Sequence, residues 1–349
     1  CTGVQATGKT LDGGTEMNAM NWIIGFAVRR RVWLMLAIAV LTGGFGFLAS
    51  RLAVDNSLEV WFVEDDPALG SYEQFLGEFG NDETVVIAFA GSGDALAADR
   101  LARLDRLTDQ IARIDGVARV QSLSNLPVPE GAELRHALEG DRLASRLVGR
   151  NQTSLLLVAW MEAGVDMDVR RPEILEEIRD AVAGQRTDDE QAHFGGVGVL
   201  YDALNRATIG EGALFIGLSY AVITIVLLLV TRRIAWTLIA LLVVTLADVA
   251  LLGTMTLLGR PINMITMALP PVVMILGVAN VVHMATDLDL ALARGVRSLS
   301  GLQEALARIT VPCGFNALTT GVAFLSLTTA NMAVTRDYGL FAAIGVGFA

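Results

Sequence analysis

The sequence has few of the residues from which enzymes and redox proteins build their sites. Its 349 residues include only two cysteines, Cys1 and Cys313, and three histidines. The cysteines form no CxxC pair, the histidines are scattered, and no P-loop, GxSxG or HExxH motif occurs. We therefore expect no enzyme activity, no metal, no cofactor and no nucleotide hydrolysis.

Charged residues are also scarce. They make up 18% of the chain, against 53% hydrophobic residues and a mean hydropathy of +0.52, which is too apolar for an ordinary soluble domain. A membrane helix needs about 20 mostly apolar residues. Six windows meet this need, at about 32–50, 211–230, 234–257, 262–286, 309–330, and a sixth that begins near 338 and is cut short at 349.

Arginines beside these windows predict the orientation of the chain, because short cytoplasmic loops hold the excess of Lys and Arg. They lie before the first window, between the second and third, and between the fourth and fifth: Arg29 to Arg31, Arg232 and Arg233, and Arg294, Arg297 and Arg308. Residues 1–31 are thus predicted to be cytoplasmic, although the polar tail 1–16, with the only lysine, precedes two methionines and is set aside.

The same topology exports residues 51–207. This segment holds 29 Asp and Glu against 15 Arg, a net charge of −14, while the whole chain has −11. Acidity of this size argues against a nucleic acid partner and against docking on an anionic lipid surface. The alternative interpretation is a solvated surface with no partner at all.

The exported segment alternates strand and helix patterns and is predicted to be a folded α/β domain. Strands are expected at 83–91, 116–124, 153–162 and 192–200, helices at 94–114 and 171–184, and an inserted helical stretch at 131–148. Pro172 is expected in the first turn of the second helix. The order βαββαβ is ferredoxin-like. The predicted fold class is therefore an α-helical integral membrane protein with a ferredoxin-like α/β domain outside the membrane.

Three separated stretches resemble the N-terminal half of a resistance-nodulation-division (RND) transporter of the hydrophobe-exporter and MMPL-like branch. They are "DNSLEVWFVEDDPALGSYEQFLGEFGNDETVVIAF" (55–89), "GRPINMITMALPPVVMILGVANVVHM" (259–284) and "VPCGFNALTTGVAFLSLTTANMAVTRDYGLFAAIGVGFA" (311–349). The resemblance implies a first span at 32–50, a porter domain at 51–207, and spans two to six at 208–349.

What the resemblance implies for function is efflux of hydrophobic or lipid-like substrates by proton antiport across the bacterial inner membrane. Complete members carry two such halves and often form dimers or trimers. This chain shows no internal repeat, so we expect a fragment whose second transporter half is missing, or a half-size protein. Two alternatives stay open: a sterol-sensing-like or assembly-scaffold module that does not transport, and a Sec-accessory protein that assists polypeptide export.

Asp248 is the only carboxylate near the middle of a predicted span. A charge there costs about 2.5–3.5 kcal/mol on insertion scales, so such residues tend to mark a functional path. We predict that Asp248 carries and releases a proton. The alternative is a hydrogen bond to a neighbouring helix through Thr245 or Thr254.

Asn280 and His283 lie three residues apart in "LGVANVVHM", on one face of the fourth span. In the family pattern an acidic residue falls three or four positions before this histidine, which is Asn280 or Ala279 here, and neither can titrate. His283 is the remaining titratable group. Asp248 should lie about 20 Å from the cytoplasmic end of its span and Asn280 about 10 Å, so no direct contact is expected.

Other residues of the spans are interpreted first as packing features. Pro270 and Pro271 should interrupt the fourth helix and free backbone carbonyls. Small and hydroxylated residues are expected to let helices approach closely or hydrogen-bond to each other; they are Gly277, Thr319, Thr320 and Gly321. By the resemblance, Thr319 and Thr320 lie beside the proton relay.

Overall fold

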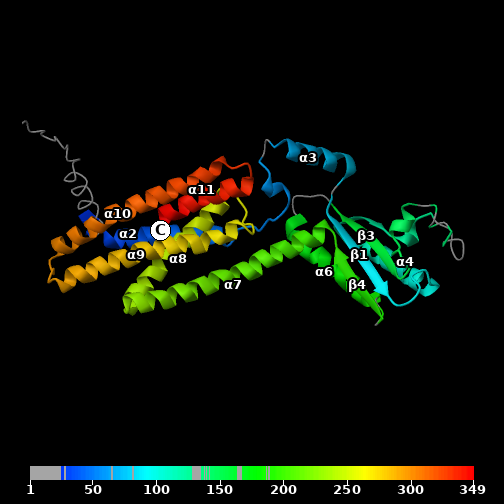
Figure 1. Cartoon of the computed structure of the whole chain (residues 1–349), viewed down its shortest axis with the longest axis horizontal. Helices are drawn as coiled ribbons and strands as arrows, with labels where there is room; N and C mark the ends of the chain where they lie inside the picture. Colours follow the sequence, from blue (N-terminus) through cyan, green and yellow to red (C-terminus); the bar gives the residue numbers. More distant parts are fainter. Residues whose placement is uncertain are drawn as a thin grey trace, which may run out of the picture. The chain divides into compact units, whose positions relative to one another are not determined.

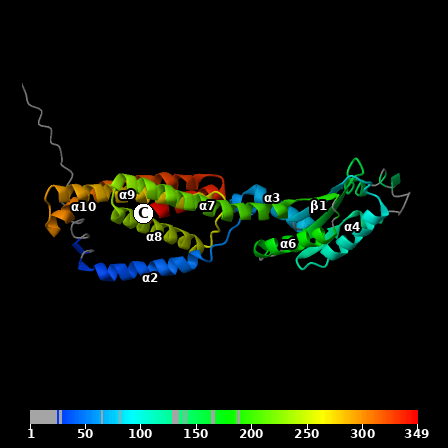
Figure 2. The same cartoon turned by 90° about the horizontal axis from the view of Figure 1, so that it is seen from below.

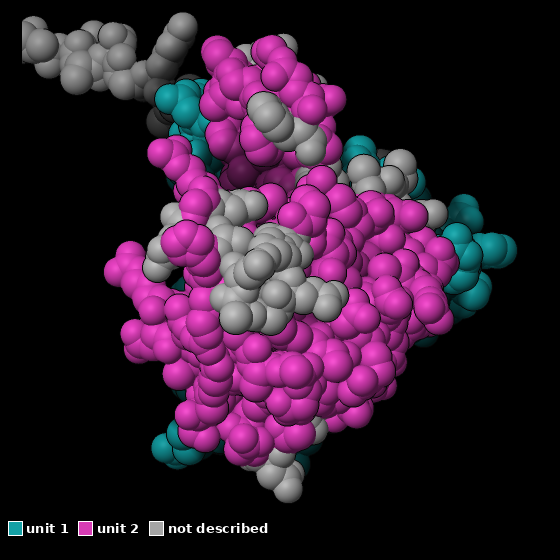
Figure 3. Space-filling view, turned by 90° about the vertical axis from the view of Figure 1, so that its right-hand side faces the viewer, with its two compact units in different colours: residues 1–55, 208–349 teal, residues 56–207 magenta. Residues whose placement is uncertain are grey.

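The computed structural model describes residues 25–26, 29–63, 66–80, 82–127, 135–136, 138, 140, 142–162, 167–185, 187 and 189–349, so the tail 1–16 lies outside the described residues. The chain divides into two compact units, which Figure 3 colours separately. Unit 1 comprises residues 1–55 and 208–349, and unit 2 comprises Asn56–Ala207.

Unit 1 is a bundle of helices, which run side by side in Figures 1 and 2. They are α2 (Arg31–Ala49), the later part of α7 (Val197–Thr231), α8 (Ile234–Leu257), α9 (Leu269–Ala293), α10 (Leu299–Leu325) and α11 (Ala333–Phe348). In the described part of the chain, five helices are long and apolar enough to cross a membrane. The sixth predicted window corresponds to α11, whose 16 residues fall short of the roughly 20 that a span needs.

Helix α8 contacts α2, α9 and α11. Its residues Leu251 and Met255 are fully buried against Val273 of α9 and Phe341 of α11. At Gly253 a Cβ atom would lie 2.6 Å from the carbonyl oxygen of Phe45 in α2. Only glycine fits where the two backbones come this close.

The prediction that Pro270 and Pro271 interrupt the fourth helix is wrong. Both prolines lie in the first turn of α9, which begins at Leu269. The backbone N–H groups of a first turn have no partner inside the helix, so proline costs nothing there. Asn263 stabilises the turn that leads into α9. Its Oδ1 accepts hydrogen bonds from the backbone N–H of Ile265 (3.0 Å) and Thr266 (2.9 Å).

Unit 2 follows the order β1 (Thr84–Gly91), α4 (Ala98–Ile111), β2 (Val117–Gln121), β3 (Ser154–Met161), α6 (Met167–Gln185) and β4 (Glu190–Gly195), with α3 (Pro67–Phe79) before it. The four strands form an antiparallel sheet in the order β2-β3-β1-β4. Alternate residues of β1 and β3 are buried, because successive side chains of a strand point to opposite faces. The buried face packs in one core with residues of α4 and α6.

Three local predictions for unit 2 need correction or lie partly outside the described residues. The strand expected at 192–200 ends at Gly195, and α7 begins at Val197. Between them, Gly196 has φ +100° and a Cβ there would lie 2.2 Å from the carbonyl oxygen of Thr84. Pro172 lies inside α6, since the helix starts earlier than expected. Of the helical stretch expected at 131–148, the described residues include a short 3-10 turn at Ala144–Arg146.

The two ends of unit 2 are tied together. The side chain of Asn56 donates to Oδ1 of Asn205 at 2.8 Å, and the backbone N–H of Leu58 donates to the hydroxyl of Tyr201 at 3.1 Å. The segment that enters unit 2 therefore lies against the one that leaves it.

A buried ion pair lies beside this junction. Arg171, 1% exposed, donates from Nε to Oε2 of Glu83 (2.8 Å) and from Nη2 to Oε1 (2.6 Å). Its guanidinium also lies 5.4 Å from the centre of the Tyr201 ring. The pair links α6 to the residue that precedes β1.

Candidate functional site

Asp248 lies in the interior of the helix bundle. It is the fifteenth residue of α8, about 21 Å along the helix from its first residue, and is 6% exposed. Its neighbours Ala247 and Leu251 belong to the apolar core of unit 1. A carboxyl group is thus buried in a helix that is otherwise long and apolar enough to cross a membrane.

The hydrogen-bond partner of this carboxyl group is Tyr220 of α7. The Tyr220 hydroxyl donates to Oδ2 of Asp248 at 3.2 Å and lies 3.1 Å from Oγ1 of Thr245. The other oxygen, Oδ1, is buried and has no hydrogen-bond partner among the described residues. Tyr220 therefore holds one oxygen of the carboxyl group and fixes the orientation of the side chain.

The two threonines that the sequence offered as partners bond their own helix instead. Thr245 donates to the carbonyl of Leu241 at 2.7 Å, and Thr254 donates to that of Ala250 at 2.6 Å. Sequence reasoning missed Tyr220. The sequence did hold a signal for this contact. Tyr220 lies 12 residues before Arg232 and Asp248 lies 15 residues after Arg233, so in two antiparallel helices they lie at similar distances from the arginine pair.

Asn280 and His283 lie at a different level of the helix bundle from Asp248. An ion pair of 2.9 Å between Arg233 and Asp289 sets a common level for α8 and α9. Measured from it, Asp248 lies about 22 Å along α8 and Asn280 about 13 Å along α9. Asn280 is half-buried and His283 exposed, and within the described ranges neither side chain has a hydrogen bond. The structure therefore does not bring them to Asp248.

The two glycines expected at close helix contacts, Gly277 and Gly321, differ in their surroundings. A Cβ at Gly277 would lie 3.0 Å from Cγ1 of Val244, so α9 approaches α8 closely at this point. At Gly321 a Cβ would meet no atom within 4 Å, so the close approach expected there is absent from the described part of the chain.

The expected hydrogen bonds from α10 to another helix are also absent from the described residues. Thr319 donates to the carbonyl of Phe315 at 2.9 Å, in its own helix, and Thr320 is half-buried without a side-chain bond. The Thr319 hydroxyl reaches the carbonyl four residues back, so its single proton is already used.

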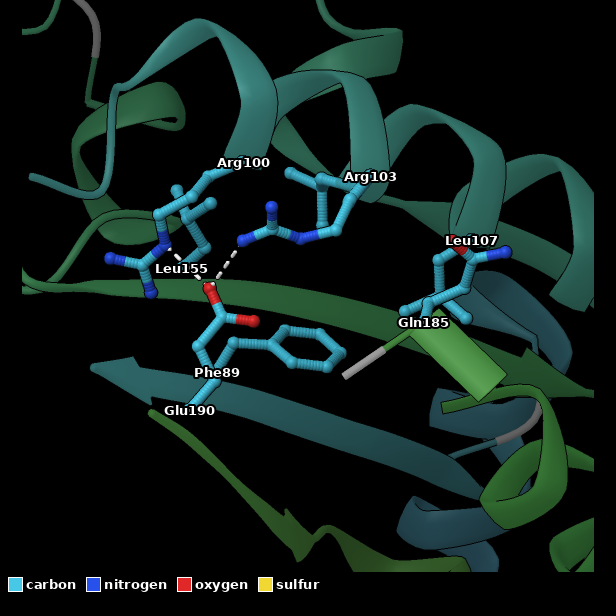
Figure 4. Close-up of a pocket in the computed structure, with 8 residues that line it drawn as sticks. Phe89, Arg100, Arg103, Leu107, Leu155, Gln185 and Glu190 are labelled. Atoms are coloured by element: carbon cyan, nitrogen blue, oxygen red, sulfur yellow. Dashed lines mark hydrogen bonds and ion pairs between the residues drawn. The ribbon is translucent and has the colours of Figure 1, made fainter. Parts of the chain in front are cut away.

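Unit 2 contains a second cluster of charges, shown in Figure 4. Oε1 of Glu190 lies 2.7 Å from Nε of Arg100 and 2.9 Å from Nη2 of Arg103. The pocket beside it has apolar walls that include Leu104 and Leu107 and leaves room for about one water molecule. Glu190 bridges the two arginines, and Arg103 also pairs with Asp99, so this cluster links α4 to β4. The pocket is too small to hold a substrate. No group of His, Cys, Asp and Glu in the described ranges could hold a metal ion.

Comparisons with known proteins also indicate that this chain is a membrane protein. Residues 67–349 match the MMPL family. The chain is also similar to a protein of Methanocaldococcus jannaschii that is named as a membrane protein, MJ1562, with 20% identity over 351 residues that cover 93% of this chain and 88% of that protein.

Proposed function

Because this chain belongs to the MMPL family, as its three motifs predicted, we propose that it is one half of a proton-coupled RND-type transporter. The chain is a multi-pass membrane protein, with five candidate spans among its described residues. Its proposed substrates are hydrophobic or lipid-like molecules, which it exports from the bacterial inner membrane. The N-terminus is proposed to be cytoplasmic, which the arginines between alternate spans support.

The observation that carries this proposal is the Asp248 carboxyl group. It is buried between helices of a candidate spanning bundle, and one of its oxygens has no partner in the described part of the chain. A buried ionisable residue in a membrane helix is costly and tends to mark a proton path. Asp248 thus accepts a proton on one side of the membrane and releases it on the other.

Proton flux into liposomes that contain the full chain tests this role. Asp248→Asn keeps the shape of the side chain and removes the titratable group, so it should abolish coupled flux. The matched control is Asp287→Asn, at the cytoplasmic end of α9, which should leave flux unchanged. Equal flux in wild type and Asp248→Asn would remove Asp248 from the mechanism.

Unit 2 is proposed to be the porter domain, with a ferredoxin-like fold. The βαββαβ order and the antiparallel sheet order β2-β3-β1-β4 support this assignment. So does its place in the chain, between the candidate spans α2 and α7.

A second set of helices, from another chain or a second copy, is proposed to complete the transporter. Support comes from His283 of α9 and from Asn316 of α10, which are polar residues with exposed side chains on candidate spans. Polar groups facing lipid are unfavourable, and polar residues of membrane helices face other helices in most cases. The mass of the detergent-free complex in lipid nanodiscs measures the oligomer, and a strict monomer would contradict a second copy.

A module that binds lipid or sterol without transport is the second candidate function. It is favoured by Asn280, which cannot titrate and lies where the family pattern expects an acid. A chain that binds such ligands in liposomes but shows no flux at any proton gradient would support it.

A further inference from the structure

The hydroxyl of Tyr220 lies between two acceptors and has only one proton to give. It is 3.2 Å from Oδ2 of Asp248 and 3.1 Å from Oγ1 of Thr245. The Thr245 hydroxyl donates its own proton to the carbonyl of Leu241 at 2.7 Å, so it can only accept from Tyr220. The Tyr220 proton therefore goes either to Asp248 or to Thr245.

The charge of Asp248 decides between these two directions. An ionised carboxylate is a stronger acceptor than a neutral hydroxyl, so the phenol donates to Asp248 when that group is charged. When the proton lies on Oδ2 of Asp248, this O–H needs an acceptor, and the Tyr220 oxygen lies 3.2 Å away. The phenol proton can then turn to Thr245, which gives a continuous chain from Asp248 through Tyr220 and Thr245 to the Leu241 carbonyl.

We propose that Tyr220 is a positioning residue that holds Asp248 in both protonation states by turning its hydroxyl between Asp248 and Thr245. The inference rests on the proposed function, because it assumes that Asp248 gains and loses a proton. The proton that binds Asp248 comes from the aqueous phase. No bond of Tyr220 breaks, since its O–H group only rotates.

Other ionisable groups on the neighbouring helices lie away from this pair in sequence. Helix α2 carries Arg31 at its first residue, and the membrane part of α7 carries Glu211 nine residues before Tyr220. The remaining groups are His283, Asp287 and Asp289 in the second half of α9, and Arg336, Asp337 and Tyr338 in the first turns of α11. In the described chain, Tyr220 is the ionisable group that contacts Asp248.

The test is a pH titration of the Asp248 carboxyl band by infrared difference spectroscopy on the full chain in lipid. Asp248→Asn identifies the band by removing it. Tyr220→Phe deletes the donor to the charged form, so the midpoint of the band should move to higher pH by about one to two units. Thr245→Val deletes the acceptor needed by the neutral form, so the midpoint should move to lower pH by a smaller amount.

Tyr338→Phe, a half-buried tyrosine of α11, is the matched control and should leave the midpoint unchanged. A structural role of Tyr220 alone would not produce shifts of opposite sign. An unchanged midpoint in Tyr220→Phe, or shifts of the same sign in both variants, overturns the inference. Equal proton flux in wild type and Asp248→Asn, together with the two opposite shifts, would refute the proposed function and leave the positioning role of Tyr220 intact.

Discussion

Replacing Glu83 with glutamine should destabilise unit 2 strongly. Arg171 is 1% exposed, and Glu83 accepts two hydrogen bonds from it at 2.8 and 2.6 Å. Glutamine has nearly the same shape but no charge, so the buried guanidinium loses the counter-charge that Glu83 supplies. Removing one partner of a buried ion pair costs about 3–5 kcal/mol.

Amide hydrogen exchange of the full chain in detergent measures this loss where it occurs. Peptides from β1 and β3 report the opening of the sheet beside the ion pair. Since about 1.4 kcal/mol corresponds to a factor of ten, their exchange should become roughly a hundred to a few thousand times faster. Peptides from α8 and α9 should exchange as in the wild type.

Two further variants make the measurement decisive. Asp99→Asn removes an exposed partner of Arg103, and exposed pairs contribute little, so exchange should hardly change. Glu83→Gln combined with Arg171→Met removes both charges of this pair, so it should recover much of the lost protection. If Glu83→Gln behaves like Asp99→Asn, or if the double variant is no better than the single one, the reasoning is refuted.

Three other predictions concern single positions. Gly253→Ala places a methyl group 2.6 Å from the carbonyl oxygen of Phe45, so thermal unfolding in detergent should show a loss of about 1–3 kcal/mol as α2 is pushed away. Pro271→Ala should lower the same unfolding free energy by about 1–2 kcal/mol, because its first-turn position spares the backbone and only buried ring carbons are lost. Burial and a hydrogen bond to Asp82 raise the pKa of Tyr72 above its usual value, so ultraviolet titration against Tyr72→Phe should show its phenol ionising at lower pH in Asp82→Asn.

The sequence predicts spans well where both ends carry a strong signal. The window 234–257 coincides with α8, Ile234–Leu257, because Arg232 and Arg233 end one apolar run and open the next. The window 211–230 covers the later part of α7, and the helix itself begins at Val197. Asp202 and Asn205 lower the hydropathy of its first turns, yet both find partners in unit 2, namely Arg179 and Asn56. Hydropathy alone cannot register such tertiary contacts.

The site was predictable only in part. A lone carboxylate in an apolar run pointed to Asp248, but which residue faces it depends on how α7 and α8 are rotated about their axes. That rotation is set by packing of many side chains, such as Leu227, Ala240 and Val281, and no short motif encodes it. The hydroxyl of Thr319 misled for a related reason, because a nearby carbonyl of its own helix competes with any neighbouring helix.

The contact between Gly253 and Phe45 joins two helices that ribosomes make far apart in time. Helix α2 is complete about 200 residues before Gly253, which at 5–20 residues per second is roughly 10–40 seconds of synthesis. During that interval α2 lies in the bilayer without α8, the helix that it contacts. The hydrogen bond between Asn56 and Asn205 limits how far α2 and the later helices can separate before they pack. Once unit 2 has folded, its two ends are held together. The membrane part of α7 then enters the bilayer from a point close in the chain's fold to the end of α2.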